Sequence, residues 1–173
     1  MATAVPEASD RQNKDDRLAR ARIAAVTVTD PELPFLTIAD MGILRDVTLD
    51  GDTVVVAITP TYSGCPAMDL IRFEVEVALE RAGLAPFRVT LVYAPAWTTD
   101  WLSEAARTKL AANGIAPPPV GAGKRALFAE ETLACPKCGS ERTRKVSDFS
   151  STACKAHWMC LACLEPFEHF KCH

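Results

Sequence analysis

The chain contains 173 residues, of which 49% are hydrophobic and 24% are charged, and its formal net charge is −3. These values predict a globular protein, either one domain or a small domain with an appended module, and they exclude an intrinsically disordered chain. The acidic net charge argues against a nucleic-acid-binding protein. The sequence also lacks a run of about 18 apolar residues, so we expect no membrane span.

The seven cysteines bear on the cellular compartment. Six of them lie after residue 134, where four form two Cys-x-x-Cys pairs. The first residues show neither the basic start nor the apolar run of a secretion signal. We therefore expect a cytoplasmic protein whose cysteines are reduced and bind metal rather than form disulfides.

The residues before the cysteine-rich end predict a mixture of helices and strands. Residues 1–13 are small and polar and predict a flexible tail. Helical spacing and turn signals predict helices over residues 14–25, 66–82 and 101–112. Runs of β-branched residues predict strands over residues 37–40, 43–49, 53–59 and 88–93. The run from Thr53 to Thr59 is β-branched on both faces, so we expect it to be the central strand.

Prolines and glycines mark a boundary after the last of these helices. Pro117-Pro-Pro119 and the glycines that follow predict a linker over residues 117–134. The sequence therefore predicts a small α+β domain over residues 14–116 and a separate C-terminal module over residues 135–173.

The strongest signal in the sequence is a pair of cysteine knuckles. They are Cys135-Pro-Lys-Cys138 and Cys160-Leu-Ala-Cys163, with 21 residues between them. This spacing is typical of a structural zinc ribbon, in which a hairpin brings the second pair of thiolates over the first. An iron–sulfur cluster on the same thiolates is the main alternative. Cys154 and Cys172 are then either packing residues or free thiols, or they form a separate site or redox pair.

Cys65 is the only cysteine before residue 135. If Pro66 begins the helix, Cys65 is its N-cap residue, and the helix dipole favours the thiolate. The hydroxyl group of Thr61 belongs to the same loop. A catalytic nucleophile also requires a base, but all three histidines fall after residue 150. Binding a soft metal requires no base, so this chemistry fits the loop better than hydrolysis does; the alternative is an inert, buried cysteine.

Asp40, which precedes Met41-Gly42, is a further candidate for the same site. It lies beside the Cys65 loop if its strand neighbours the central strand. The alternative is a turn residue whose side chain bonds to its own backbone, and spacing alone favours this alternative.

Three motifs in the first domain resemble the small domain shared by iron–sulfur assembly factors of the SufT type. They are Asp30-Pro-Glu-Leu-Pro34, Asp40-Met-Gly-Ile43 and Thr59-Pro-Thr-Tyr-Ser-Gly-Cys65-Pro66. Further motifs follow at Trp97-Thr-Thr-Asp-Trp101, Gly114-Ile-Ala-Pro-Pro118, Ser151-Thr-Ala-Cys-Lys155, Glu165-Pro-Phe167 and Phe170-Lys-Cys172. Together they make the chain resemble PaaD, the family of accessory proteins of the multicomponent phenylacetyl-CoA epoxidase. The resemblance covers about residues 16–173.

The resemblance implies assembly or maturation rather than catalytic turnover. The epoxidase combines a di-iron oxygenase with a reductase that carries flavin and an iron–sulfur cluster, and a PaaD-like protein would help to assemble or maintain one of these centres. The family's cysteine falls on Cys65 and its acidic residue on Asp40, with Thr61 in the same motif as the cysteine. The C-terminal motifs include Cys154 and Cys172, which adds these two residues to the candidate metal ligands.

One hypothesis combines these interpretations. Cys65 handles a transient iron or iron–sulfur cargo, a structural zinc holds the C-terminal ribbon, and the ribbon recognises the client. The implied partners are the oxygenase and reductase subunits; neither nucleic acid nor a membrane is expected, and a homodimer is compatible with the resemblance. The main alternative is a non-catalytic scaffold in which Cys65 is structural. A free-standing enzyme has the least support, because no base accompanies Cys65.

Overall fold

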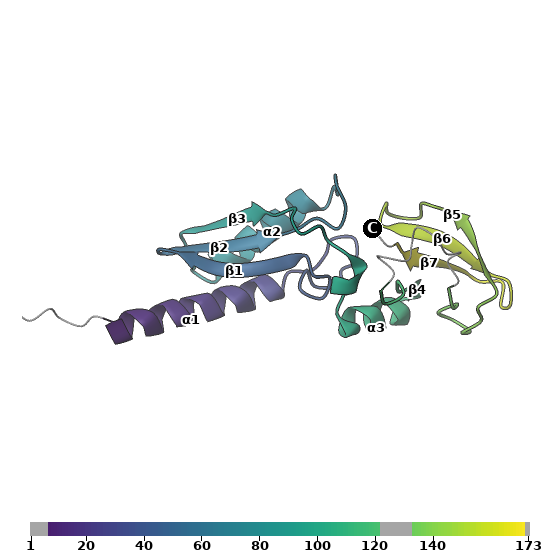
Figure 1. Cartoon of the computed structure of the whole chain (residues 1–173), viewed down its shortest axis with the longest axis horizontal. Helices are drawn as coiled ribbons and strands as arrows, with labels where there is room; N and C mark the ends of the chain where they lie inside the picture. Colours follow the sequence, from purple (N-terminus) through teal and green to yellow (C-terminus); the bar gives the residue numbers. More distant parts are fainter. Residues whose placement is uncertain (1–6, 122–132, 172–173) are drawn as a thin grey trace, which may run out of the picture. The chain divides into compact units, whose positions relative to one another are not determined.

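The computed structural model describes residues 7–121 and 133–171, and Figure 1 shows its helices and strands. The chain forms two compact units. Within the described residues, the first contains residues 7–39, 43–60 and 64–95. The second contains residues 40–42, 61–63, 96–121 and 133–171. Helices and strands occur in both units, which confirms the α+β class.

The first unit is built on a three-stranded sheet in the order β1-β2-β3. The strands β1 (Leu44–Asp50) and β2 (Thr53–Ile58) form an antiparallel hairpin, and β3 (Phe87–Leu91) runs parallel to β2. The central place of β2 confirms the prediction from its β-branched residues. Alternate residues of β2 are buried, which fits a strand with one face on the core.

Two helices complete the core of the first unit (Figure 1). They are α1 (Glu7–Val26) and α2 (Met68–Arg81). The apolar residues Ile71, Val75 and Leu79 of α2 recur at helical spacing and are fully buried. On α1 the buried positions are alanines, which allow that helix to approach its neighbours closely.

The helix α1 begins seven residues earlier than predicted, so residues 7–13 are helical rather than a loose tail. This segment is rich in charged residues that favour helices, and Lys14 lies 3.6 Å from Asp10 in an i,i+4 ion pair. The polar composition of residues 7–13 led to the wrong prediction of a flexible tail there, because an exposed helix needs no apolar face along its whole length. Residues 1–6 of the predicted tail lie outside the described residues.

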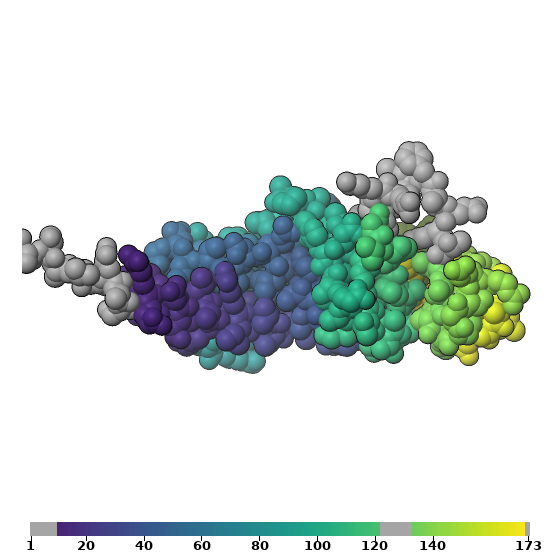
Figure 2. Space-filling view, turned by 60° about the horizontal axis from the view of Figure 1, so that its bottom comes forward, coloured from purple at the N-terminus to yellow at the C-terminus, as the bar shows by residue number. Residues whose placement is uncertain are grey.

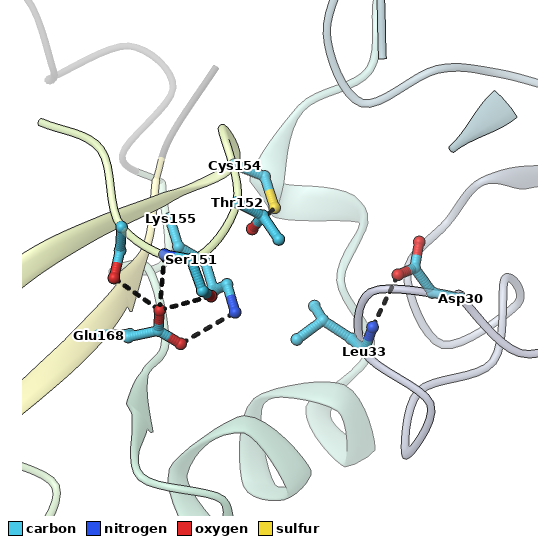
Figure 3. Close-up of polar contacts among 8 residues, drawn as sticks. Asp30, Leu33, Ser151, Thr152, Cys154, Lys155 and Glu168 are labelled. Carbon is cyan, nitrogen blue, oxygen red and sulfur yellow. Dashed lines mark hydrogen bonds and ion pairs between the residues drawn. The ribbon is translucent and has the colours of Figure 1, made fainter. Parts of the chain in front are cut away.

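The predicted strand over residues 37–40 is wrong. Thr37 makes a single isolated bridge to Thr29, and turns follow. The cause lies in the preceding loop, where Asp30 Oδ1 accepts a hydrogen bond of 2.9 Å from the Leu33 N–H (Figure 3). It accepts another of 2.8 Å from the Glu32 N–H. These bonds fold the loop into turns that bury its apolar side chains, so no extended run remains to pair with the sheet.

The second unit contains a four-stranded sheet in the order β4-β7-β6-β5. Its strands are β4 (Ile115–Ala116), β5 (Thr143–Ser147), β6 (Lys155–Cys160) and β7 (Pro166–Phe170). They are preceded by the 3-10 helix η1 (Thr99–Trp101) and by α3 (Glu104–Ala112). The helix α3 starts later than predicted because Ser103 caps it, its Oγ accepting a hydrogen bond of 2.9 Å from the Ala106 N–H.

The short strand β4 pairs in parallel with β7. The ribbon sheet therefore includes a part of the chain that precedes the proline-rich segment. The division into a domain over residues 14–116, a linker over 117–134 and a ribbon over 135–173, with independent folding of the two domains, remains a prediction. Residues 122–132 of the predicted linker lie outside the described residues.

The close approach of Gly42 to Trp101 gives a stability prediction. Gly42 has a φ of 67°, and a Cβ there would lie 2.7 Å from the Cβ of Trp101 and 2.9 Å from its backbone oxygen. Gly114 in the same unit has a φ of 74° but open space around it. We expect Gly114→Ala to cost about 1 kcal/mol from backbone strain, and Gly42→Ala about 1–3 kcal/mol more from the clash. Urea unfolding of both variants measures this, and equal losses would contradict the clash.

Candidate functional site

The zinc-type knuckles meet across the hairpin of β5 and β6. This antiparallel pair places Thr143 opposite Cys160, so the knuckle before β5 faces the one that follows β6. The intervening residues therefore form the hairpin that the spacing predicted. Cys135 and Cys160 are buried, whereas Cys138 and Cys163 are accessible to solvent.

The four sulfur atoms have the spacing of ligands around a single ion. All of them lie within 4.8 Å of one another. The Sγ atoms of Cys135 and Cys163 are 3.8 Å apart, and those of Cys138 and Cys160 are 3.6 Å apart. A tetrahedral zinc ion with Zn–S bonds of about 2.3 Å requires sulfur atoms about 3.8 Å apart. The donor set thus fits zinc, and a filled, four-thiolate site would leave no open position for a substrate.

The pKa values of two of these thiols are shifted in opposite directions. The backbone N–H groups of Cys163 and Ala162 lower the pKa of Cys160 to about 6, against the effect of burial. The backbone N–H of Glu165 lowers the pKa of Cys163, but burial and the three neighbouring thiols raise it overall to about 12. Without a cation, neighbouring thiolates repel one another, so some of the thiols keep their protons. A cation that stabilises all four thiolates must therefore displace protons on binding.

The two knuckles are also joined by an ion pair. Lys137 Nζ lies 2.7 Å from Glu165 Oε2, and this hydrogen bond raises the pKa of Lys137. Both side chains are about half exposed, so the pair contributes little to stability. It marks the two turns as neighbours on the surface.

Cys154 lies apart from the four-cysteine cluster. It is buried, and its sulfur lies 3.0 Å from Thr152 Oγ1 (Figure 3). Its backbone oxygen accepts a hydrogen bond from the Lys171 N–H. Its role as an additional ligand remains a prediction, and Cys172 lies outside the described residues.

A polar clamp around Glu168 was not predicted from the sequence. Its carboxylate accepts hydrogen bonds from Ser150 Oγ at 2.6 Å, from Ser151 Oγ at 2.7 Å and from the Ser151 N–H at 3.1 Å. Lys155, whose side chain is only 6% exposed, pairs with it at 2.9 Å (Figure 3). The clamp fastens the loop that carries Cys154 to β7. The only sequence signal for it is that Ser150, Ser151 and Lys155 occur within six consecutive residues.

The start of α2 corrects the prediction for Cys65. The first helical residue is Met68, and Ala67 is the N-cap. Cys65 lies two residues before the cap, in a turn where its backbone oxygen accepts a 3.3 Å hydrogen bond from the Met68 N–H. The helix dipole acts mainly within its first turn, so the expected stabilisation of a thiolate loses its basis. The Cys65 side chain is half-buried.

Asp40 is held by α3 and the residue that caps it. Its Oδ2 lies 2.5 Å from Lys109 Nζ, and its Oδ1 lies 3.3 Å from Ser103 Oγ. The Asp40 backbone oxygen also accepts a 2.9 Å bond from the Ser103 N–H. Asp40 and the buried Thr61 belong to the second unit, and Cys65 belongs to the first, so their grouping into one site remains a prediction.

Comparison with known proteins identifies both halves of the chain. Residues 22–92 match the family described as "Iron-sulfur cluster assembly protein", and residues 120–171 match "PaaD zinc beta ribbon domain". The fold of the first part is similar to the crystal structure of a domain of unknown function from Bacillus anthracis. The TM-score is 0.53 and the identity 26%, over 58% of this chain and 96% of that one. The chain thus combines a domain of the iron–sulfur assembly type with a zinc β-ribbon.

Two curated relatives define the family. The first, from Escherichia coli strain K12, is named as the putative D component of 1,2-phenylacetyl-CoA epoxidase and is 46% identical over 84% of this chain and 87% of its own length. The second, from Porphyromonas gingivalis, is named "Fe-S protein maturation auxiliary factor" and is 35% identical over 49% of this chain and 81% of its own length. The chain belongs to the PaaD family, the D components of phenylacetyl-CoA epoxidase. None of the described helices is long and apolar enough to cross a membrane.

The cluster geometry predicts about one zinc ion per chain. Cys138→Ser should remove most of the zinc, because it leaves three thiolates, whereas Cys154→Ser should keep it, because this residue is outside the cluster. Elemental analysis of the purified variants measures both, and chelation should unfold the ribbon, as followed by circular dichroism. Iron with visible charge-transfer absorption, in place of zinc, would contradict the assignment.

The clamp on Glu168 predicts a pH-dependent contribution to stability. Burial raises the pKa of Glu168, but the hydrogen bonds from Ser150, Lys155 and Ser151 lower it overall, from 4.5 to about 2. The stabilisation is therefore full above about pH 4.5 and is lost as the pH falls toward 2. The difference in melting temperature between the wild type and Glu168→Gln should shrink over that range. The exposed Glu141→Gln is the control, and a constant difference for Glu168→Gln would refute the clamp.

Proposed function

We propose that this protein is an accessory and maturation factor of the phenylacetyl-CoA epoxidase in aerobic phenylacetate degradation. In this role it helps to assemble or maintain a di-iron or iron–sulfur centre in a partner subunit. The main support is the match of residues 22–92 to an iron–sulfur assembly family, since this range contains Cys65. The relative named as a maturation auxiliary factor supports the same conclusion.

Cys65 is the residue that we assign to the transient metal or cluster. It lies in the loop between β2 and α2, with the exposed residues Gly64 and Pro66 on either side. A half-buried thiol in an exposed loop can reach a partner protein and still be shielded from bulk solvent. A thiolate is a suitable ligand for iron, and the iron or cluster is here a cargo rather than a resident cofactor.

The proposed role is non-catalytic. A cysteine nucleophile needs a base, and His157 and His169, the histidines of the described chain, both belong to the second unit. His169 is fully buried, with Nδ1 3.0 Å from the Ala116 oxygen, so it serves packing in the ribbon. The zinc ribbon, filled by four thiolates, has a structural role and presents a surface to partners. The oxygenase and reductase subunits are the partners, and the cytoplasm is the location.

One observation favours a second function, that of a scaffold with a structural Cys65. The helix α2 begins beyond Cys65, so the helix does not activate this thiol in the way the sequence predicted. A scaffold would need the surfaces of the protein but not its thiol.

The two functions differ in what Cys65→Ser does in cells. Under the maturation role, the variant should lower the metal content and the activity of the epoxidase to near the level without this protein, because the cargo loses a ligand. Under the scaffold role, both should stay at the wild-type level. Elemental analysis of the purified oxygenase and reductase measures the outcome, with Cys154→Ser as a control for the loss of a thiol elsewhere. Unchanged metal content in the Cys65 variant would exclude the transfer role.

A further inference from the structure

The strand β5 forms an outer edge of the ribbon sheet. In the order β4-β7-β6-β5 it pairs with β6, and no other strand within residues 7–121 and 133–171 pairs with its other side (Figure 1). An edge strand presents backbone N–H and C=O groups that another extended chain can bind. This edge is therefore a surface whose chemistry can be read from its side chains.

The edge is open to solvent along most of its length. At its first residue, Thr143 Oγ1 donates a 2.8 Å hydrogen bond to the Leu133 oxygen. The four residues that follow, from Arg144 to Ser147, are all exposed. The neighbouring strand β6 is mostly buried, which shows that the exposure is specific to the edge. Figure 2 shows the light-green part of the ribbon, around residue 140, at the molecular surface.

The open edge is basic, although the chain as a whole is acidic. Arg142, Arg144 and Lys145 lie within four consecutive residues, and all three are exposed. Lys145 lies 3.3 Å from Asp148 Oδ1 and 5.7 Å from the centre of the Trp158 ring, so its charge is already engaged within the ribbon. Arg142 precedes β5 in a tight turn, in which the Thr143 N–H donates a 2.9 Å hydrogen bond to the Glu141 oxygen, and Arg144 is the second residue of the strand. The two exposed arginines therefore mark the start of this edge.

Charges at an edge can also serve to prevent aggregation. β5 is short and has a bulge between Lys145 and Ser147, and both features discourage pairing with another sheet. Yet Val146 and Phe149 are 47% and 64% exposed, and apolar side chains do not protect an edge. Basic residues beside exposed apolar residues repel a basic strand, but they complement an acidic one that also carries apolar groups.

We propose that β5 binds an extended acidic segment of a partner protein by strand addition. Backbone hydrogen bonds would form along Arg144–Ser147, and carboxylates of the segment would meet Arg144 and, at the start of the strand, Arg142. Because the bulge at Val146 interrupts the alternation of side chains, an apolar residue between the carboxylates would contact Val146. This inference goes beyond the proposed function and is independent of Cys65, so a failure of metal transfer would leave it intact.

The test uses the full-length, zinc-loaded protein and a fluorescent synthetic peptide in which glutamate alternates with valine. Fluorescence anisotropy should show that this peptide binds about tenfold more tightly than a matched peptide with glutamine in place of glutamate, because two exposed ion pairs are lost. Arg142→Glu combined with Arg144→Glu should weaken binding of the glutamate peptide by at least the same factor. The control is Arg22→Glu on the exposed surface of α1, which should leave the affinity unchanged.

Hydrogen exchange separates strand addition from simple charge attraction. The bound glutamate peptide should slow the exchange of backbone amides within Arg144–Ser147, and a peptide with prolines in place of the valines should neither bind tightly nor protect them. The proposal would be overturned if the peptide bound without this protection, or if the glutamate and glutamine peptides bound with equal affinity. It would also be overturned if Arg22→Glu lost as much affinity as the double variant, or if single-stranded DNA bound more tightly than the glutamate peptide. Zinc content shows whether the double variant is folded. If it is not, the single variant Arg144→Gln takes its place, with an expected loss of about threefold in peptide affinity.

Discussion

The ribbon depends on four sulfur atoms being held at one place. The register of β5 and β6 brings the two knuckles together, and the resulting sulfur separations suit one tetrahedral ion. Among the described residues of the ribbon, one hydrophobic cluster contains seven buried residues, and two of them, Cys135 and Cys160, belong to the four-cysteine site. A core of that size stabilises a fold only weakly, so we infer that metal coordination and folding of the ribbon are a single event.

A second constraint acts on the loop that carries Cys154. The motif Ser151-Thr-Ala-Cys-Lys155 contributed to the family resemblance, and the structure gives its polar members a physical role. Ser151 and Lys155 both bind the Glu168 carboxylate, which fixes the loop against β7. Cys154, which is buried, lies in the loop that this clamp holds. The motif is accounted for by hydrogen bonding, and a ligand role for Cys154 stands as a separate proposal.

In the first unit, the fold and the chemistry of Cys65 have different support. Its fold type is supported by the match to an iron–sulfur assembly family and by the similar crystal structure. The chemistry of Cys65 was expected to arise from the helix N-terminus, and a shift of two residues in the helix start removes that cause. The maturation proposal therefore rests on the family, and the scaffold proposal gains from the geometry. The two proposals agree that the protein acts through contact with partner subunits.

Local chemistry let the sequence determine several features by itself. A run of β-branched residues predicted β2 as the central strand, and the spacing of two cysteine pairs predicted the hairpin and its four ligands, since both patterns can be recognised in the residue order without knowing their contacts. The tertiary structure decided the contacts that no such pattern marks. Lys109 binds Asp40 from 69 positions away, and the Glu168 clamp joins residues from opposite ends of a hairpin. It also decided that Cys65 precedes the N-cap of α2, where Ala67 and Met68 are buried.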